Sequence, residues 1–329
     1  MKKITGIKYL MILCALILLY YCVPAFSDVY IITVLNSALI FYVACLGINV
    51  MLGMGGMVSF AAIAFMGIGA YTSANCNLKL SLNPFVSLII SMIVSGVAAF
   101  LIGLVLLRLK GTFFTFSTVA LVQIAYSIFT NWREVTGGPD GMGGISTFCL
   151  GSLKAVTPKE NYYVLFTICL LSCLFVLRLK KTNLGRALSS VRDNELAAKV
   201  MGINVYMTKV IAFMIAGILA GLAGGMMVFN YHFVGSSSFT FDQSLTLIIM
   251  TMLGGVFHPI GVFLGTVLIT MLPEWFKPLQ EYIRLFYGLG VMLLMVFMPM
   301  GLWGSISKIT SGIQKKFHLG IRTVIGADE

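Results

Sequence analysis

Side chains that commonly perform chemistry are few in this sequence, and their spacing fits no familiar reactive site. The three histidines, His232, His258 and His318, lie too far apart to form the close pairs that bind zinc. No phosphate-binding loop of the type G-x-x-x-x-G-K-[ST] occurs, which excludes nucleotide hydrolysis by that route. We therefore expect no enzyme activity, no metal site and no cofactor in this chain.

The richest cluster of charged side chains lies between residues 178 and 209, which hold seven of the 22 lysines and arginines. Residue types that begin, build and end a helix follow one another there: Asp193, Asn194, Glu195, Ala197, Ala198 and Gly202. Asp and Asn are good N-caps, Ala is the strongest helix former, and Gly often stops a helix at the C′ position. This order predicts a helix of about two turns, preceded by a second helical stretch around residues 186–191.

The predicted short helix has an apolar edge formed by Leu196, Val200 and Met201. Three charged residues flank this edge, namely Arg192, Glu195 and Lys199. Such a helix can lie in the groove of a partner protein, with its charges fixing the register. It can equally be a membrane-surface helix that only connects two spans, and periodicity alone leaves both alternatives open.

The elements around this segment must be membrane spans, because 59% of all residues are hydrophobic and only 10% are charged. A mean hydropathy of +0.99 is incompatible with a soluble globule. We predict an all-α polytopic bundle of about ten transmembrane or re-entrant helices. The apolar runs are residues 9–25, 29–52, 57–74, 84–107, 112–131, 162–177, 210–229, 242–257, 261–273 and 283–299. The third, eighth and ninth runs are short or interrupted by glycine, which predicts re-entrant or broken helices.

The distribution of positive charge predicts how this bundle lies in the membrane. With the N-terminus inside, 16 of the 22 lysines and arginines fall in inner segments, as the positive-inside rule requires. We therefore expect both termini in the cytoplasm, a transmembrane domain over residues 1–304 and a basic cytoplasmic tail over residues 305–329. Residues 178–209 become an inner loop and residues 132–161 the largest outer loop. This bias also explains the net charge of +11, so we predict no nucleic-acid role.

The predicted spans carry almost no ionisable side chain, since Asp242, Glu274 and Arg284 fall at span ends. A transporter driven by protons or ions normally buries such a group in the membrane. Uphill transport by this chain would therefore need energy from another subunit. The first span is expected to remain uncleaved, with a cleaved signal peptide as the alternative.

Glycines inside the predicted spans indicate two kinds of structure. A stripe of small residues, for which close helix packing is the default explanation, comprises Gly217, Gly221, Gly224 and Gly225. A second set is less easily explained by packing and comprises Gly53, Gly55, Gly56, Gly67 and Gly69. Since each glycine weakens a helix by about 1 kcal/mol relative to alanine, we predict a broken helix there, near the midplane. The candidate pathway residues are Ser59, Phe65, Gly67, Gly69 and Tyr71.

Several sequence blocks resemble one family of membrane proteins. The pattern Ala197-Ala198, three residues, Gly202 is similar to the "EAA…G" loop by which permeases of ABC importers insert a coupling helix into their ATPase. The wider block GRALSSVRDNELAAKVMGINV, residues 185–205, resembles the permeases of branched-chain amino acid ABC importers. Further blocks resemble the same family and extend the match over residues 52–304: 56–74, which resembles its third-span signature, 252–274 and 299–304. The blocks 108–124 and 136–145 resemble the M-type of its two permease subunits.

Four positions depart from the family pattern. Leu196 stands where the loop motif has glutamate, and Met300 stands where the family commonly has arginine. Ala61 and Ala62 replace the usual Gly-His pair, which removes a polar side chain from a glycine-rich span. This last departure bears on the identity of the solute rather than on the class of transporter.

The resemblance implies the permease subunit of an ATP-driven importer in a prokaryotic cell membrane, translocating leucine, isoleucine and valine. The implied partners are a second homologous permease subunit, two cytoplasmic ABC ATPases that bind the ATP, and an external solute-binding protein. The implied ATPase-coupling residues are Gly185, Arg186, Arg192, Asp193, Asn194, Glu195, Ala197, Ala198 and Gly202. A related importer of urea or short amides, or a passive solute facilitator, remains the alternative.

The implied binding protein would dock on the outer loop. The candidate docking residues are Thr136, Gly137, Gly138, Asp140 and Gly141. A solvated turn around Pro139 explains the same residues equally well, because Gly, Pro and Asp are the usual residues of turns.

Overall fold

The structure is a computed structural model that describes residue 24, residues 28–109, 111–150, 153–155 and 157–275, and residues 288 and 292. The longer helices are α2 (Val29–Ile48), α3 (Ala62–Leu78), α4 (Pro84–Leu106), α5 (Thr112–Asn131), α7 (Pro158–Leu179), α10 (Val205–Tyr231), α11 (Phe241–Gly254) and α12 (Pro259–Trp275). A π-helical segment, η1 (Asn49–Met54), continues α2. The short helices are α6 (Arg133–Thr136), η2 (Gly138–Asp140), α8 (Asn183–Asp193), α9 (Glu195–Val200) and η3 (Ser236–Ser238).

Five of these helical segments are long and apolar enough to cross a membrane: α2 with η1, α4, α5, α7 and α10. The helices α3, α11 and α12 have only 17, 14 and 17 residues. At 1.5 Å per residue they span about 21–26 Å, less than the ~30 Å of a hydrocarbon core. They correspond to the third, eighth and ninth predicted spans, which the sequence marked as short or interrupted. The spans predicted at residues 9–25 and 283–299 lie almost entirely outside the described residues, and the tail 305–329 lies wholly outside them.

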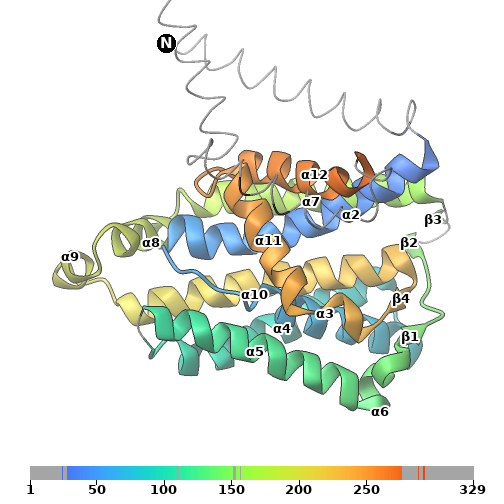
Figure 1. The fold of residues 1–329 in the computed structure, drawn as a ribbon, viewed down its shortest axis with the longest axis horizontal. Helices are drawn as coiled ribbons and strands as arrows, with labels where there is room; N and C mark the ends of the chain where they lie inside the picture. Colours follow the sequence, from blue (N-terminus) through green and yellow to red (C-terminus); the bar gives the residue numbers. More distant parts are fainter. Residues whose placement is uncertain are drawn as a thin grey trace, which may run out of the picture.

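Most of the long helices lie side by side along the long axis of the molecule, with α10 in the middle, and α11 crosses them steeply (Figure 1). The central helix α10 packs against α2, α3 and α4, while α5 and α7 lie on opposite flanks. One end of the bundle carries α8 and α9 and is called the α9 end. The other end carries α6 and four short strands and is called the strand end.

The glycine stripe of α10 lets α3 and α4 approach closely, as the sequence predicts. A β-carbon built on Gly217 would lie 2.2 Å from the β-carbon of Ala99, and one on Gly224 would lie 1.9 Å from a backbone oxygen of α3. The hydroxyl of Ser95 in α4 donates a hydrogen bond of 2.7 Å to the carbonyl of Gly217. No residue larger than glycine fits at these crossing points without moving backbone.

The predicted break in the third span is present between η1 and α3. The π-helical segment η1 ends at Met54, residues 56–60 form no regular secondary structure, and α3 begins at Ala62. Side chains of α5 satisfy the freed backbone groups, since Thr115 donates to the Val58 carbonyl and the Phe60 amide donates to Thr118. Irregular backbone is tolerated inside a membrane protein only where its polar groups find such partners.

The expectation that packing does not explain Gly67 and Gly69 is wrong. A β-carbon on Gly67 would lie 2.3 Å from the ring of Phe129, and one on Gly69 would lie 2.3 Å from the carbonyl oxygen of Gly221. Both glycines therefore allow α3 to pack tightly against α5 and α10. Flexibility of the span is not needed to account for them.

Two short β-ribbons lie at the strand end and were not anticipated by the all-α prediction. The first pairs β1 (Met142–Gly143) with β4 (Phe233–Val234), and the second pairs β2 (Phe148–Leu150) with β3 (Leu153–Ala155), both antiparallel. The β1–β4 pair ties the loop after α5 to the turn after α10. The outer loop is thus folded against the bundle rather than free.

Candidate functional site

The polar segment between α7 and α10 folds into two short capped helices. The side chain of Thr182 caps α8 by accepting a hydrogen bond of 3.3 Å from the Gly185 amide. The side-chain oxygen of Asn194 caps α9 by accepting two hydrogen bonds of 3.0 Å from the backbone amides that follow it. The predicted pair of helical stretches and the predicted N-cap type are both confirmed.

The end of α9 is also built as the sequence predicts. Gly202 has φ of +83°, the left-handed conformation that glycine adopts without steric cost. Its amide donates to the Lys199 carbonyl at 3.1 Å, and the amide of Ile203 donates to the Ala198 carbonyl at 3.1 Å. This pair of hydrogen bonds is a Schellman motif, which closes α9 and satisfies its last carbonyl groups.

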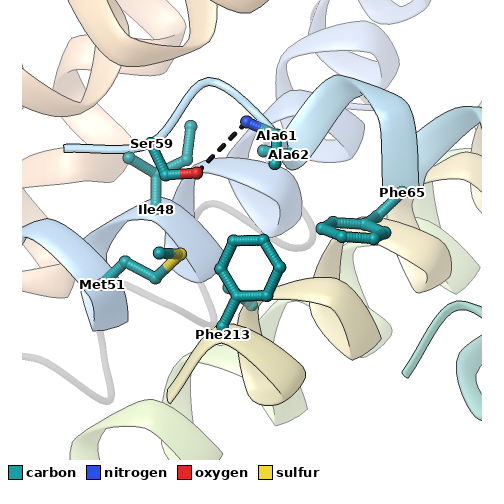
Figure 2. Close-up of a pocket in the computed structure, with 8 residues that line it drawn as sticks. Ile48, Met51, Ser59, Ala61, Ala62, Phe65 and Phe213 are labelled. Carbon is teal, nitrogen blue, oxygen red and sulfur yellow. Dashed lines mark hydrogen bonds between the residues drawn. The ribbon is translucent and has the colours of Figure 1, made fainter. Parts of the chain in front are cut away.

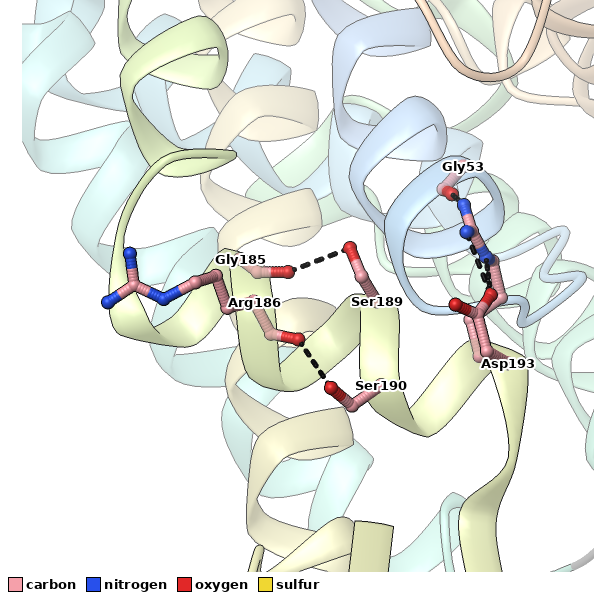
Figure 3. Close-up of polar contacts among 7 residues, drawn as sticks. Gly53, Gly185, Arg186, Ser189, Ser190 and Asp193 are labelled. Carbon is pink, nitrogen blue, oxygen red and sulfur yellow. Dashed lines mark hydrogen bonds and ion pairs between the residues drawn. The ribbon is translucent and has the colours of Figure 1, made fainter. Parts of the chain in front are cut away.

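Arg192 anchors this segment to the broken span. Its guanidinium donates a hydrogen bond of 2.8 Å to the backbone carbonyl of Gly53 in η1 and also forms an ion pair of 2.8 Å with Asp193 (Figure 3). The same group lies 5.0 Å from the centre of the Phe257 ring, a cation–π contact. One side chain therefore joins α8, η1 and the loop between α11 and α12.

Further contacts draw these three elements together at the α9 end. The amide of Asn49 in η1 donates to the Val256 carbonyl, and Lys180 donates a hydrogen bond of 3.1 Å to the Phe257 carbonyl. Glu195 at the start of α9 forms an ion pair with Lys209 in α10. Within the described chain, α9 is thus held at its base from two directions.

The outward side of α9 is apolar and exposed. Leu196, Val200 and Met201 are 78%, 87% and 81% exposed, whereas Ala198 on the inner side is only 3% exposed. In Figure 1, α9 lies at the tip of the molecule, beyond the ends of the long helices. The predicted apolar edge therefore exists and faces away from the bundle.

Gly185 and Arg186 lie at the start of α8. A β-carbon on Gly185 would lie 2.3 Å from the Leu179 carbonyl, so this glycine lets α8 turn closely under α7. Arg186 is exposed and donates to the Lys181 carbonyl at 3.1 Å. Ser189 and Ser190 donate back to the carbonyls of Gly185 and Arg186, so their hydroxyls belong to the helix itself (Figure 3).

A small cavity lies beside the broken span (Figure 2). Its lining residues are Ile48, Met51, Ser59, Ala61, Ala62, Phe65, Phe213 and Ala216. The space open to the centre of a water-sized sphere is about 10 Å³, roughly what one water molecule needs. Ser59, whose hydroxyl accepts from the Ala61 amide at 3.2 Å, is the one side chain among these eight with a polar group.

Two of the five candidate pathway residues, Ser59 and Phe65, thus meet at one cavity, and the other three lie elsewhere. Gly67 and Gly69 serve helix packing, as described above. Tyr71 packs between the rings of Phe129 and Phe239, at centroid distances of 5.0 and 5.9 Å. Its buried hydroxyl has no hydrogen-bond partner within the described residues.

The candidate docking loop is a tightly constrained turn. Thr136 is buried, and its hydroxyl lies 2.7 Å from the Phe129 carbonyl and accepts a hydrogen bond of 3.1 Å from the Gly138 amide. Gly137, Gly138 and Gly141 all have positive φ angles, of +73°, +66° and +70°. Turn geometry therefore accounts for the glycines, and Asp140 is the exposed charged side chain of the turn.

The sequence did not indicate the partners of Arg192. Gly53 receives its hydrogen bond through a backbone carbonyl, which has no signature in residue type. Phe257 lies in an apolar run, where an aromatic residue is most simply explained as part of a span. The sequence also did not predict the ion pair of Glu195 with Lys209, because these residues are 14 positions apart and lie in different helices.

Comparison with known proteins decides the family. Residues 30–298 match the family described as branched-chain amino acid transport system / permease component. The chain belongs to this permease family. It is therefore a multi-pass protein of the cell membrane and a permease component of an ABC transport system rather than an enzyme.

Relatives of this permease cover most of the chain. It is 31% identical over 290 residues to the high-affinity branched-chain amino acid transport system permease protein LivM of Salmonella typhimurium, covering 81% of this chain and 68% of the relative. It is 29% identical over 319 residues to LivM of Escherichia coli, covering 90% and 75%. It is 26% identical over 287 residues to the autoinducer 2 import system permease protein LsrC of an Enterobacter species, covering 82% and 76%. No solved structure matches.

Proposed function

We propose that this permease is the membrane subunit of an ATP-driven importer of branched-chain amino acids. Two ABC ATPases bind the ATP, a second homologous permease completes the membrane part, and an external binding protein delivers the solute. The observation that carries the coupling role is the exposed apolar edge of α9, held in place at its base by Arg192 and Glu195.

The exposed edge of α9 calls for a protein partner. Three large apolar side chains on one short helix are costly to leave in water, at about 25 cal/mol for each Å² of apolar surface. Helix caps at both ends fix the shape of α9 before any partner binds. A short, preorganised helix with an apolar edge and flanking charges suits a groove on an ATPase.

Movement of α9 reaches the pathway through Arg192. This side chain holds the Gly53 carbonyl, and residues 55–61 follow directly after η1. Ser59 and Ala61 of that segment line the small cavity, together with Phe213 of α10. ATPase closure would therefore move η1 and the loop 255–258 together and open or close the cavity between them.

The positive charges support an orientation with the α9 end in the cytoplasm. The lysines and arginines at that end include Arg108, Arg178, Lys180, Lys181, Arg186, Arg192, Lys199 and Lys209. Lys79, Arg133 and Lys159 lie at the strand end. In this orientation the outer loop faces the binding protein, and about ten spans place both termini in the cytoplasm.

The solute assignment rests on the relatives. The LivM relatives are branched-chain amino acid permeases by name, whereas LsrC is a permease for autoinducer 2. The greater similarity to LivM favours branched-chain amino acids over a different small solute.

Affinity purification of the chain from its native membrane tests this proposal. We compare wild type with the double variant Leu196→Asp, Val200→Asp, and use Leu80→Asp as a matched control. Leu80 is 64% exposed and lies at the opposite end, so the control places one of the same carboxylates on an exposed apolar position away from α9. Ala198 is avoided, because a carboxylate at this buried position would disturb folding rather than docking.

We expect ABC ATPases to copurify with wild type and Leu80→Asp but not with the double variant. Leucine uptake by the same cells should stop when ATP is depleted. Recovery of no ATPase with the wild-type protein, or uptake that continues without ATP, would contradict the proposal and favour a passive facilitator.

A further inference from the structure

The exposed surfaces of α4 and α5 differ in chemistry, although both helices are long and apolar enough to cross a membrane. Every exposed side chain of α4 is valine, isoleucine or leucine. Such a surface suits the hydrocarbon of the bilayer, which offers no hydrogen bonds. The surface of α4 is therefore the reference for the residue types that a lipid-facing helix of this chain exposes.

The exposed surface of α5 does not match that reference. Gln123 and Ser127 are exposed, and they share one helix face with Phe116, Ala120 and Asn131, because these positions recur at intervals of three and four residues. Gln123 lies near the middle of the 20-residue helix, far from either end. Within the described residues its amide has no hydrogen-bond partner.

An unpaired amide near the centre of the bilayer is unfavourable, and polar side chains in membrane helices almost always face protein or a water-filled path. This face of α5 points away from the other described helices, along the flank opposite α7 (Figure 1). The described part of the chain offers Gln123 no hydrogen-bond partner, and another chain within the membrane can supply one.

The broken span packs against the other, buried side of α5. Thr115 and Thr118 of α5 hold residues 58 and 60, and the side chain of Val58 is 41% exposed. Irregular backbone inside a membrane needs either protein cover or a water-filled path beside it. Thr115 and Thr118 supply hydrogen bonds to the break, so the partner that Gln123 lacks is a separate requirement of the opposite face.

We propose that the α5 face formed by Phe116, Ala120, Gln123, Ser127 and Asn131 is the contact surface for the second, homologous permease subunit. This inference rests on the proposed importer function. A homologous chain presents an equivalent helix, so the two helices meet across an approximate two-fold axis and their polar groups pair with each other. The small residues Ala120 and Ser127 allow close approach.

Photo-crosslinking in the assembled transporter tests the contact. The full chain carries benzoylphenylalanine in place of Gln123, and a matched variant carries it in place of Ile93, an exposed residue of α4. After irradiation of native membranes, the Gln123 position should give a crosslinked product that contains a second multi-pass permease, identified by mass spectrometry. The Ile93 position should give no such product.

A second pair of variants measures assembly itself. Ala120→Trp adds bulk to the proposed contact, and Val97→Trp adds similar bulk to the exposed surface of α4. The amount of second permease recovered per copy of this chain should fall several-fold for Ala120→Trp and stay at the wild-type level for Val97→Trp. An unchanged thermal midpoint of the purified Ala120→Trp chain confirms that the chain itself still folds.

Copurification with wild type separates this inference from the proposed function. If a second permease and ATPases copurify but the Gln123 position crosslinks neither, the importer stands and the α5 contact is wrong. A product of twice the mass of this chain would also overturn it, because the partner would then be a second copy. If wild type recovers neither partner, the importer proposal itself fails.

Discussion

Each end of the bundle has a glycine in the left-handed conformation, but the two glycines differ in how closely other atoms surround them. At the strand end, Gly137 has φ of +73°, and a β-carbon there would lie 2.2 Å from the Gly141 carbonyl oxygen. At the α9 end, Gly202 has φ of +83°, and a β-carbon there would meet no atom within 4 Å. The first glycine is required by conformation and by packing, the second by conformation alone.

This difference extends to the surroundings of each glycine. At the strand end, Lys79 donates to the Glu134 carbonyl at 2.9 Å and Asn77 donates to Ser146 at 2.7 Å, which fasten the outer loop to α3. At the α9 end, the outer half of α9 has open space around it and exposes apolar side chains. The strand end is thus packed tightly against the bundle, whereas α9 projects from the other end and leaves an apolar edge free for a partner.

Gly137→Ala should give the largest loss of stability. The left-handed conformation costs an alanine about 1–2 kcal/mol, and overpacking adds about 1–3 kcal/mol more. We expect the thermal midpoint of the purified chain in detergent to fall clearly, with the outer loop becoming sensitive to protease. A loss as small as that of Gly202→Ala would contradict the contrast between the two ends.

Gly202→Ala should cost less, about 1–2 kcal/mol, because only the backbone conformation opposes the change. Gly202→Asn should be milder still, since asparagine tolerates the left-handed region better than alanine. The same thermal measurement checks both variants against Gly137→Ala. Equal losses for alanine at the two positions would show that the space around Gly202 is smaller than the structure indicates.

Local signals in the sequence were enough to predict much of this end. Asn194 and Gly202 predicted where α9 begins and ends, because helix capping depends on the residue types themselves. The span predicted at residues 112–131 coincides with α5. In contrast, α10 begins at Val205 rather than 210, since Asn204 caps it and Lys209 inside its first turns pairs with Glu195.

Tertiary contacts account for what the sequence left open. The sequence alone does not distinguish a glycine that breaks a helix from one that lets a neighbouring helix approach. For Gly67 and Gly69, the nearby positions of Phe129 and Gly221 show that the reason is packing. Arg192 was recognised as part of the coupling segment, but its partners are a backbone carbonyl and a ring 65 residues away. Such pairings depend on how distant helices pack, which one sequence does not encode in its local pattern.

Acid should weaken the α9 end through His258, by a smaller amount. Partial burial and the nearby Lys180 ammonium lower the pKa of this imidazole in the folded chain. The unfolded chain, with an ordinary pKa of about 6.5, then binds the proton more readily, so stability is full above that value and is lost as the pH falls from it through the lower pKa of the folded chain. The thermal midpoint should drop more between pH 7.5 and pH 5.5 in wild type than in His258→Gln. Equal drops would show that His258 does not contribute.

The smallest effect on stability should come from Leu196→Ser with Val200→Ser, even though these changes reach the proposed docking edge. Both side chains are at least 78% exposed in the isolated chain, so their removal should change the free energy of unfolding by only about 0.5 kcal/mol. The same change should sharply reduce ATPase recovery and leucine uptake, because the edge would be buried only in the complex. Val29→Ser, at a similarly apolar and exposed position of the strand end, serves as the control and should leave both recovery and uptake intact.

Loss of stability without loss of ATPase recovery would mean that the edge packs against this chain rather than against a partner. Loss of ATPase recovery without loss of stability would show that the α9 end serves a partner, whereas the strand end serves the fold of this chain.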